Sequence, residues 1–304
     1  MPAFRLLISL LFLVLSSWHC GLPKAHAADG VAERAGVARP LTAPPAASVR
    51  VDQTAGRGDL APPVRSDQAR ILFILASARV HGSSTIPASI SFGEVVHAWD
   101  TFHAAGYAID FVTPDGGDVP ILDAYVDDEV APRLEDARIM RGLRNTATPA
   151  QIDPDRYRAV YYVGGSNAMY GVPEHSALQR IAAHVYERNG GVISAVCHGT
   201  AGIVHIRLAN GQYLVSGKRI SGYPEDHEDQ DAAYFREFPF LIRQTVEARG
   251  GSFHMVDSEA PYIEIDGRVV TGQNYASAAP VAETVVDVLR GIAAQSSRAD
   301  TAQR

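Results

Sequence analysis

The fold is decided by the stretch Gly190-Gly191-Val192-Ile193-Ser194-Ala195-Val196-Cys197-His198-Gly199-Thr200-Ala201-Gly202. An apolar run of strand length ends at a cysteine, and small residues follow at the start of an expected helix. This layout predicts a nucleophile elbow, a sharp strand-to-helix turn that projects Cys197 from the top of a sheet. Backbone N–H groups and the helix dipole at such a turn favour a thiolate. The alternative is a buried structural cysteine at the end of a core strand.

The first 27 residues have the pattern of a secretory signal peptide. Arg5 precedes an apolar run over 6–15, and the small residues of a cleavage site lie at 25–27. The run is short for a bilayer span, so a retained membrane anchor is the less favoured alternative. We expect cleavage after Ala27 and a periplasmic or secreted mature chain without membrane association.

Cleavage changes both the charge and the cysteine content. It removes Arg5 and Lys24, which takes the formal net charge from −7 to −9. Such an acidic chain argues against nucleic acid and anionic lipid as partners. It also removes Cys20 and leaves Cys197 as the only cysteine. A lone thiol cannot form an internal disulfide, and this favours a chemical role for Cys197.

The rest of the chain divides into a linker, one folded domain and a tail. Residues 28–68 are rich in Ala and Pro without periodicity, which predicts a flexible linker. Residues 69–293 carry the alternating strand and helix patterns of a single catalytic domain, and 294–304 are expected to be a disordered tail. Strands are expected at 71–76, 108–113, 159–163, before Cys197, and at 252–256, 262–265 and 269–271. Helices are expected at 93–105, 134–143, 175–188, 200–208, 231–248 (interrupted by Pro239) and 279–289.

This alternation predicts a three-layer α/β/α sandwich with a mostly parallel sheet, a flavodoxin-like arrangement. The functional site is then expected at the carboxyl ends of the strands. Glu94, in the first turn of the helix at 93–105, can reach the elbow at that edge. A buried carboxyl there can share a proton with the sulfur, or Glu94 can simply complement the helix N-terminus. His198 follows the nucleophile and is either its proton partner or a surface histidine.

Two loops offer further candidates. The segment 221–229 holds several carboxylates that could orient His198, or it is a solvated acidic loop or a weak cation site. Gly165, Ser166 and Asn167 follow a strand and could present backbone N–H groups to an oxyanion or substrate. No pattern has dedicated metal-ligand spacing, so no metal site is expected. Structural or surface roles are therefore expected for the remaining histidines considered, His81, His97, His103, His184 and His254.

Taken together, these segments resemble the ThiJ/PfpI superfamily, which has a class I glutamine amidotransferase-like fold. The branch most similar is that of glutathione-independent glyoxalases and heat-shock-type chaperones. The resemblance covers about 70–290 and is carried by Glu94-Val95-Val96-His97-Ala98-Trp99-Asp100-Thr101-Phe102, by Gly190–Gly199 around the elbow, and by Val269-Val270-Thr271-Gly272-Gln273-Asn274-Tyr275-Ala276-Ser277-Ala278.

The resemblance implies that Cys197 is the nucleophile, His198 its catalytic partner and Glu94 the carboxyl that contacts the thiol. By this resemblance, the acid that orients His198 is best matched by Glu228, and Asp226 is the second candidate. The resemblance also implies a homodimer and no organic cofactor. Relatives tend to carry Gly-His-Gly where this chain has Gly165-Ser166-Asn167, a departure that concerns the substrate pocket.

The expected function is that of a cysteine-dependent enzyme acting on small reactive carbonyls. The leading hypothesis is glyoxalase III-like conversion of methylglyoxal to lactate without glutathione, a lyase reaction of the D-lactate dehydratase type, or a related deglycase activity. The alternatives are a cysteine amidase or peptidase, an exported holdase chaperone and a redox sensor. Glutamine amidotransfer is not expected, because the chain has no His-x-Glu pair after Cys197.

Overall fold

A six-stranded sheet organises the molecule. The computed structural model describes residues 69–302, so the expected signal peptide and linker lie outside the described residues. The strand order is β2-β1-β3-β4-β8-β7, and every neighbouring pair is parallel except β7 with β8. The strands are β1 (Arg70–Ile74), β2 (Ala108–Val112), β3 (Tyr157–Tyr162), β4 (Val192–Val196), β7 (Ile263–Asp266) and β8 (Val269–Gly272). A second, two-stranded sheet pairs β5 (Arg219–Ile220) with β6 (Ser252–Phe253).

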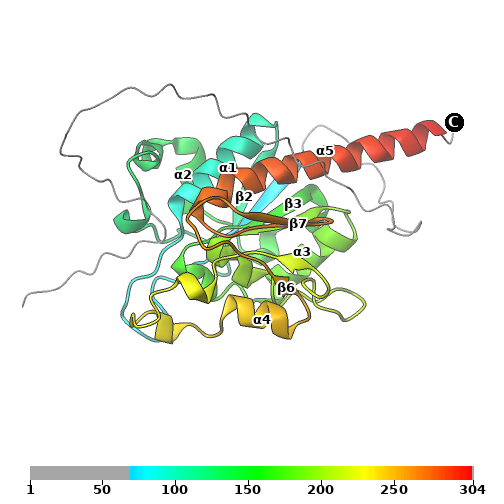
Figure 1. The fold of residues 1–304 in the computed structure, drawn as a ribbon. Helices are drawn as coiled ribbons and strands as arrows, with labels where there is room; N and C mark the ends of the chain where they lie inside the picture. Colours follow the sequence, from blue (N-terminus) through cyan, green and yellow to red (C-terminus); the bar gives the residue numbers. More distant parts are fainter. Residues whose placement is uncertain (1–68, 303–304) are drawn as a thin grey trace, which may run out of the picture.

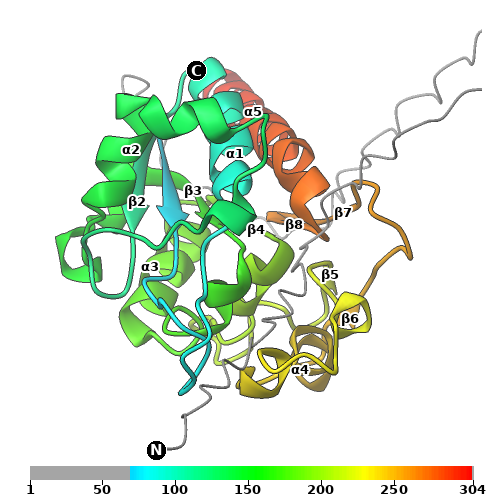
Figure 2. The same ribbon diagram turned by 90° about the vertical axis from the view of Figure 1, so that its left-hand side faces the viewer.

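Helices cover both faces of the large sheet, as expected for a three-layer sandwich (Figures 1 and 2). Helices α1 (Phe92–Ala104) and α5 (Ala278–Ala302) pack against each other on one face. Helix α2 (Ala137–Arg144) contributes to the same hydrophobic cluster. The opposite face is covered by α3 (Ser176–Glu187) and α4 (Ile242–Ala248). Short 3₁₀ helices span Asp123–Tyr125, Ala131–Glu135, Pro149–Gln151, Pro154–Arg156, Ser166–Met169, Cys197–Gly202, Glu225–His227, Phe235–Glu237 and Tyr275–Ser277.

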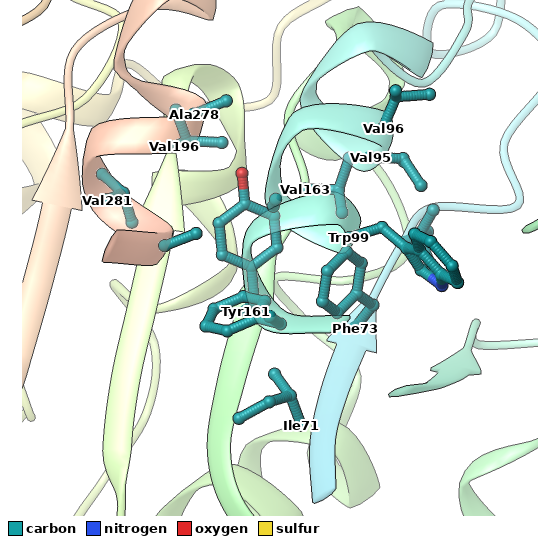
Figure 3. Packing of buried hydrophobic residues seen from close by; sticks show 14 of the residues in the cluster. Ile71, Phe73, Val95, Val96, Trp99, Tyr161, Val163, Val196, Ala278 and Val281 are labelled. Atoms are coloured by element: carbon teal, nitrogen blue, oxygen red, sulfur yellow. The ribbon is translucent and has the colours of Figure 1, made fainter. Parts of the chain in front are cut away.

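The core lies on both sides of the sheet because the central strands are apolar on both faces. In β1, Phe73 points toward α1, whereas Leu72 and Ile74 pack on the α3 side. Figure 3 shows Phe73 and Tyr161, from neighbouring strands, side by side beneath α1, and their ring centroids are 4.8 Å apart. This rigid parallel core fixes the carboxyl ends of β1, β3 and β4, from which the site is built.

Three expected helices differ from the structure, and the strand expected at 252–256 is reduced to Ser252–Phe253 in the second sheet. The helix expected at 200–208 is a 3₁₀ helix over Cys197–Gly202 followed by turns. Glycine disfavours the α-helix, and the backbone at Gly199 and Gly202 packs directly against Tyr162. The helix expected at 231–248 is reduced to a 3₁₀ turn and α4, since the residue before Pro239 is extended (ψ 126°).

The third difference is at the C-terminus. Helix α5 continues to Ala302, past the expected domain end at 293, so the expectation of a disordered tail is wrong for 294–302. The helix projects beyond the sandwich in Figure 1. Residues such as Ala, Gln and Arg have adequate helix propensity, so a helix can continue there without an apolar stripe. Within residues 69–302, none of the helices combines the length and apolarity needed to cross a bilayer.

Candidate active site

Cys197 occupies a strained elbow at the end of β4. Val196 is extended (φ −135°, ψ 144°), and Cys197 then has φ +55°, the left-handed region that favours glycine. A non-glycine residue in this region costs roughly 1–2 kcal/mol. The turn is tight because a β-carbon on Gly199 would lie 2.4 Å from the carbonyl oxygen of Tyr162. The structure therefore contains the strand-to-turn elbow expected from the sequence, with a 3₁₀ helix in place of the α-helix.

His198 bridges the cysteine and a carboxylate. Its Nδ1 lies 3.4 Å from the Sγ atom of Cys197, and its Nε2 lies 2.6 Å from Oε1 of Glu228. The carboxylate can only accept, so Nε2 carries the proton and Nδ1 is left to accept the thiol proton. The pair is buried, with the His198 and Glu228 side chains 4% and 6% exposed. The three side chains have the connectivity of a Cys–His–acid triad.

The structure separates the two candidate acids. Glu228 contacts His198, whereas Asp226 is exposed and forms an ion pair with Arg243 at 2.6 Å. Glu228 is thus the carboxylate in position to orient His198. It lies directly after the 3₁₀ turn Glu225–His227, whose first residue is anchored by the backbone N–H groups of Arg243 and Gln244.

Glu94 is buried beside the elbow. Its Oε2 atom accepts a hydrogen bond from the backbone N–H of Gly164 at 2.7 Å, and the residue has no exposed surface. The buried Tyr161 lies in the same region. Its pKa is raised by burial first, and then by the negative charges of Glu94 and Cys197. Glu94 and Cys197 therefore both lie near enough to Tyr161 to affect its pKa. Helix α1 places Glu94 at the elbow, as expected from the alignment of parallel strands.

The segment after β3 packs against the loop after β1 and the start of α1. Gly165 has φ +102°, and a β-carbon there would lie 2.4 Å from the backbone nitrogen of Ser91. Asn167 donates its side-chain amide to the carbonyl oxygens of Ala76 and Ala78, and its backbone N–H to Ser89. These bonds occupy the donors of Asn167 in this structure, and substrate or oxyanion binding by Gly165, Ser166 and Asn167 stays a prediction. Asn167 holds the loop after β1 in place.

Ser166 remains beside the site. Its Oγ atom accepts a hydrogen bond from the hydroxyl of Tyr125 at 2.9 Å, and the residue is 4% exposed. Tyr125 comes from the polar region between β2 and α2. This contact brings a hydroxyl from a distant segment to the Gly164–Ser166 turn.

His81 is a member of the site that the sequence did not indicate. It is fully buried, its ring centroid lies 5.4 Å from that of Tyr234, and Nδ1 is 3.3 Å from the hydroxyl of Tyr170. Burial, and then the charge of His198, lower the pKa of His81 to about 4, while Glu228 acts in the opposite direction. His81 lies in the loop after β1, at the carboxyl edge of the sheet. This position is the feature of the sequence that could have indicated a place in the site.

Aromatic rings enclose His198. Tyr223 stacks on its imidazole with centroids 4.7 Å apart, and Phe238 meets it edge-on at 5.8 Å. Beside them is a cavity of about 10 Å³, which is room for about one water molecule. It is lined by Met169, His198, Tyr223, Glu225, Glu228, Phe235, Phe238, Phe240, Leu241 and Ile242.

Cys197 is more enclosed than an elbow nucleophile is expected to be. The residue has no exposed surface and belongs to the hydrophobic cluster under α1 and α5. A reagent therefore needs a local opening of the structure to reach the sulfur. A purely structural cysteine would be equally buried. The contact of Cys197 with a buried His198–Glu228 pair is what favours a chemical role.

The other histidines considered have structural contacts. His97 pairs with the Tyr275 hydroxyl, His103 stacks on Trp99, and His184 pairs with Asp155. His254 contacts the Ser252 hydroxyl. In the described part of the chain, no three His, Cys, Asp or Glu residues gather as a metal site.

Curated proteins similar to this chain include two fungal ones. Glyoxalase 3 of Candida albicans is 29% identical over 206 residues, which is 64% of this chain and 86% of that protein. A protein of Schizosaccharomyces pombe, named as a probable glutathione-independent glyoxalase, is 30% identical over 154 residues, 49% of this chain and 68% of that protein. No family model matches the chain.

Solved structures show the same fold. The crystal structure of glyoxalase III from Candida albicans superimposes with a TM-score of 0.66 at 25% identity, covering 72% of this chain and 97% of that one. A ThiJ/PfpI domain protein from Brachyspira murdochii superimposes with a TM-score of 0.51 at 14% identity, covering 74% and 98%. The second comparison supports the fold alone.

Proposed function

The chain belongs to the glutathione-independent glyoxalase branch of the ThiJ/PfpI superfamily, and on this basis we propose that it converts methylglyoxal to lactate without glutathione. The observation that carries the proposal is the buried Cys197–His198–Glu228 triad with the carboxyl of Glu94 at the same elbow. A soft nucleophile and a proton-relaying carboxyl are the two groups that an internal redox isomerisation needs.

The first step forms a carbon–sulfur bond. Nδ1 of His198 accepts the thiol proton, and the Cys197 thiolate attacks the aldehyde carbon of methylglyoxal. The aldehyde oxygen takes a proton and the product is a hemithioacetal. Glu228 stabilises the imidazolium that forms and holds the ring in the required tautomer.

The second step moves a proton between neighbouring carbons. Glu94 removes the proton from the former aldehyde carbon and returns it to the former ketone carbon through an enediolate, while the hydroxyl proton of the hemithioacetal moves to the former ketone oxygen. The first carbon is thereby oxidised to a thioester and the second is reduced to a secondary alcohol. Water, activated by His198, then cleaves the thioester to lactate and regenerates the Cys197 thiol. One methylglyoxal and one water are consumed for each lactate, and no external oxidant is needed.

The burial of the sulfur favours a small substrate. Methylglyoxal is a three-carbon molecule and requires a limited opening, whereas a peptide would require a groove that reaches Cys197. The cavity of about 10 Å³ beside His198 offers no such groove. Amide or peptide hydrolysis is therefore the less favoured use of the same triad. Among the described residues, Val80 is the exposed large hydrophobic side chain, at 38%, which does not favour a holdase.

The proposal extends to where the enzyme works and how it assembles. The basic, apolar and small-residue pattern of 1–27 supports export and a periplasmic or secreted enzyme. N-terminal sequencing of the protein from an exporting host tests this, with a chain beginning at Ala28 as the expected result. The family resemblance supports a homodimer, which sedimentation velocity tests directly.

The activity test compares the wild type with Cys197→Ala. Purified protein is incubated with methylglyoxal in the absence of glutathione, and lactate is assayed. We expect lactate from the wild type and none above background from Cys197→Ala. No lactate from the wild type, or equal lactate from both, rejects the proposal. Release of amine from a peptide library, with no turnover of dicarbonyls, would favour hydrolysis instead.

A further inference from the structure

Glu228 has a second hydrogen bond that the triad alone does not explain. Its Oε1 atom contacts His198, and its Oε2 atom accepts a hydrogen bond from the hydroxyl of Tyr234 at 2.8 Å. We propose that Tyr234 is a positioning residue that fixes Glu228, so that the carboxylate holds His198 in the orientation facing Cys197. The kinetic part of this inference rests on the proposed glyoxalase function, and the geometric part does not.

The burial of Glu228 makes the second hydrogen bond important. Its side chain is 6% exposed, so its oxygens have little access to hydrogen bonds from water. An ionised carboxylate in such a place is costly unless its oxygens accept hydrogen bonds from protein groups. His198 donates a hydrogen bond to one oxygen, and the Tyr234 hydroxyl donates to the other. Without Tyr234, half of the carboxylate would lose its donor.

Tyr234 is itself held by packing. Its ring meets Phe238 at 5.7 Å edge-on and lies 5.4 Å from the ring of His81. The residues between Glu228 and Tyr234 form turns and bends and belong to no helix or strand. The hydrogen bond from Tyr234 to Glu228 therefore ties the two ends of this stretch together and restrains the carboxylate.

The hydroxyl remains a donor at neutral pH. Burial, and then the charge of Glu228, raise the pKa of Tyr234 well above its ordinary value. His81 remains neutral because its pKa is lowered to about 4. No positive charge from His81 therefore competes with His198 for Glu228. The ionisable groups near this pair include Cys197, His81, Tyr170, Tyr223, Glu225, Tyr234 and Glu237.

Loss of the Tyr234 hydroxyl should move the titration midpoint of the His198–Glu228 pair in a definite direction. Removing the Tyr234 hydroxyl destabilises the anionic carboxylate, so the proton affinity of the coupled His198–Glu228 pair rises. The titration midpoint of the pair then moves to higher pH. The acid limb of the pH profile of kcat/KM moves in the same direction.

The experiment compares Tyr234→Phe with Tyr162→Phe. Tyr162 is a matched control, since its hydroxyl is buried and has no hydrogen-bond partner within the described residues. The side-chain N–H proton and the titration of His198 are followed by NMR, thermal melting reports the fold, and kcat and KM are measured on methylglyoxal. For Tyr234→Phe we expect a roughly 10- to 100-fold loss of kcat, the scale of one hydrogen bond to a charged group, with KM nearly unchanged.

The outcomes separate this inference from the proposed function. A shifted or exchange-broadened His198 N–H signal and a raised midpoint in Tyr234→Phe, with neither in Tyr162→Phe, support positioning even if the wild type makes no lactate. An unchanged signal, midpoint and kcat in Tyr234→Phe overturn it. If Tyr234→Phe does not fold, 3,5-difluorotyrosine at position 234 supplies a stronger donor and should lower the His198 midpoint. An unchanged or raised midpoint there also overturns the inference.

Discussion

Glu94 and Cys197 both pack against Gly164. The Oε2 atom of Glu94 lies 2.6 Å, and the Cβ atom of Cys197 lies 2.9 Å, from the point that a β-carbon on Gly164 would occupy. The carboxyl and the nucleophile therefore converge on a residue without a side chain. The backbone N–H of Gly164 also donates to Glu94, so this glycine both makes room for the acid and orients it.

We expect Gly164→Ala to damage the site more than the fold. The added methyl must displace Glu94 or the elbow, and all of its close neighbours are buried. The expected result is at least a tenfold loss of lactate formation, with a destabilisation on the order of 1–3 kcal/mol from overpacking. Steady-state kinetics and urea unfolding measure the two effects. Wild-type activity in Gly164→Ala would show that catalysis does not depend on the close packing of Glu94 and Cys197 around Gly164.

Glu228 and Asp226 provide a matched pair of carboxylates. Glu228→Gln removes the charge that stabilises protonated His198, so we expect kcat to fall by roughly 10²-fold or more. Asp226→Asn changes an exposed ion pair with Arg243 and should leave kcat within about twofold. Lactate assays on both variants check this. Equal effects of the two substitutions would contradict the assignment of Glu228.

Glu94→Gln tests proton relay separately from packing. The amide has nearly the shape of the carboxyl and can still accept the hydrogen bond from Gly164, but it cannot carry a proton between carbons. We expect a roughly 10²- to 10⁴-fold loss of turnover with stability retained. Mass spectrometry should still detect the adduct of methylglyoxal with Cys197 in this variant. Retained turnover would exclude Glu94 as the relay.

His81 predicts an acid-sensitive stability. Its pKa is about 4 in the folded protein against about 6.5 in the unfolded chain, so the unfolded chain binds the extra proton between these values. The contribution of His81 to the free energy of unfolding is therefore present above pH 6.5 and falls as the pH drops toward 4. After allowance for partial solvation, the loss is on the order of 2 kcal/mol.

The measurement is urea unfolding of the wild type and His81→Phe at pH 7, 5 and 4. The wild type should lose more stability over this range than His81→Phe, since phenylalanine does not titrate. Parallel losses in the two proteins would assign the acid sensitivity to other groups.

Tyr162→Phe should not destabilise the protein. The Tyr162 hydroxyl is fully buried, and no partner for it lies within residues 69–302. An unsatisfied buried hydroxyl carries a desolvation cost that phenylalanine does not have, so the variant should be equal to the wild type or up to roughly 1 kcal/mol more stable. Thermal and urea unfolding measure this. A clear loss of stability would reveal a partner such as a buried water.

The sequence contained the parts of the site that depend on short-range pattern. The elbow is encoded by a continuous apolar strand that ends at Cys197 and by the glycine at 199. Glu94 could be placed because parallel strands bring their carboxyl ends to one edge. Helix and strand positions in the sheet core were predicted well for the same reason, since long apolar periodicity is the strongest local signal.

The rest of the site depends on contacts between distant segments. His81, Tyr223 and Tyr234 reach His198 from three separate loops, and no spacing in the sequence indicates that they meet. Gly165, Ser166 and Asn167 were expected to present backbone N–H groups to an oxyanion because they follow a strand, and the sequence did not indicate that Asn167 also donates to the loop after β1. The 3₁₀ turn after Cys197 reflects close packing of glycine backbone on Tyr162, which helix propensity alone does not include.

The enclosure of Cys197 also limits disulfide exchange at its sulfur outside reducing conditions. Oxidised glutathione and the disulfides of other proteins are too large to meet a sulfur with no exposed surface, so mixed disulfides form only as fast as the structure opens. A small aldehyde needs a smaller opening than these oxidants do. The same closed architecture can thus admit the substrate while it slows disulfide exchange at the thiol.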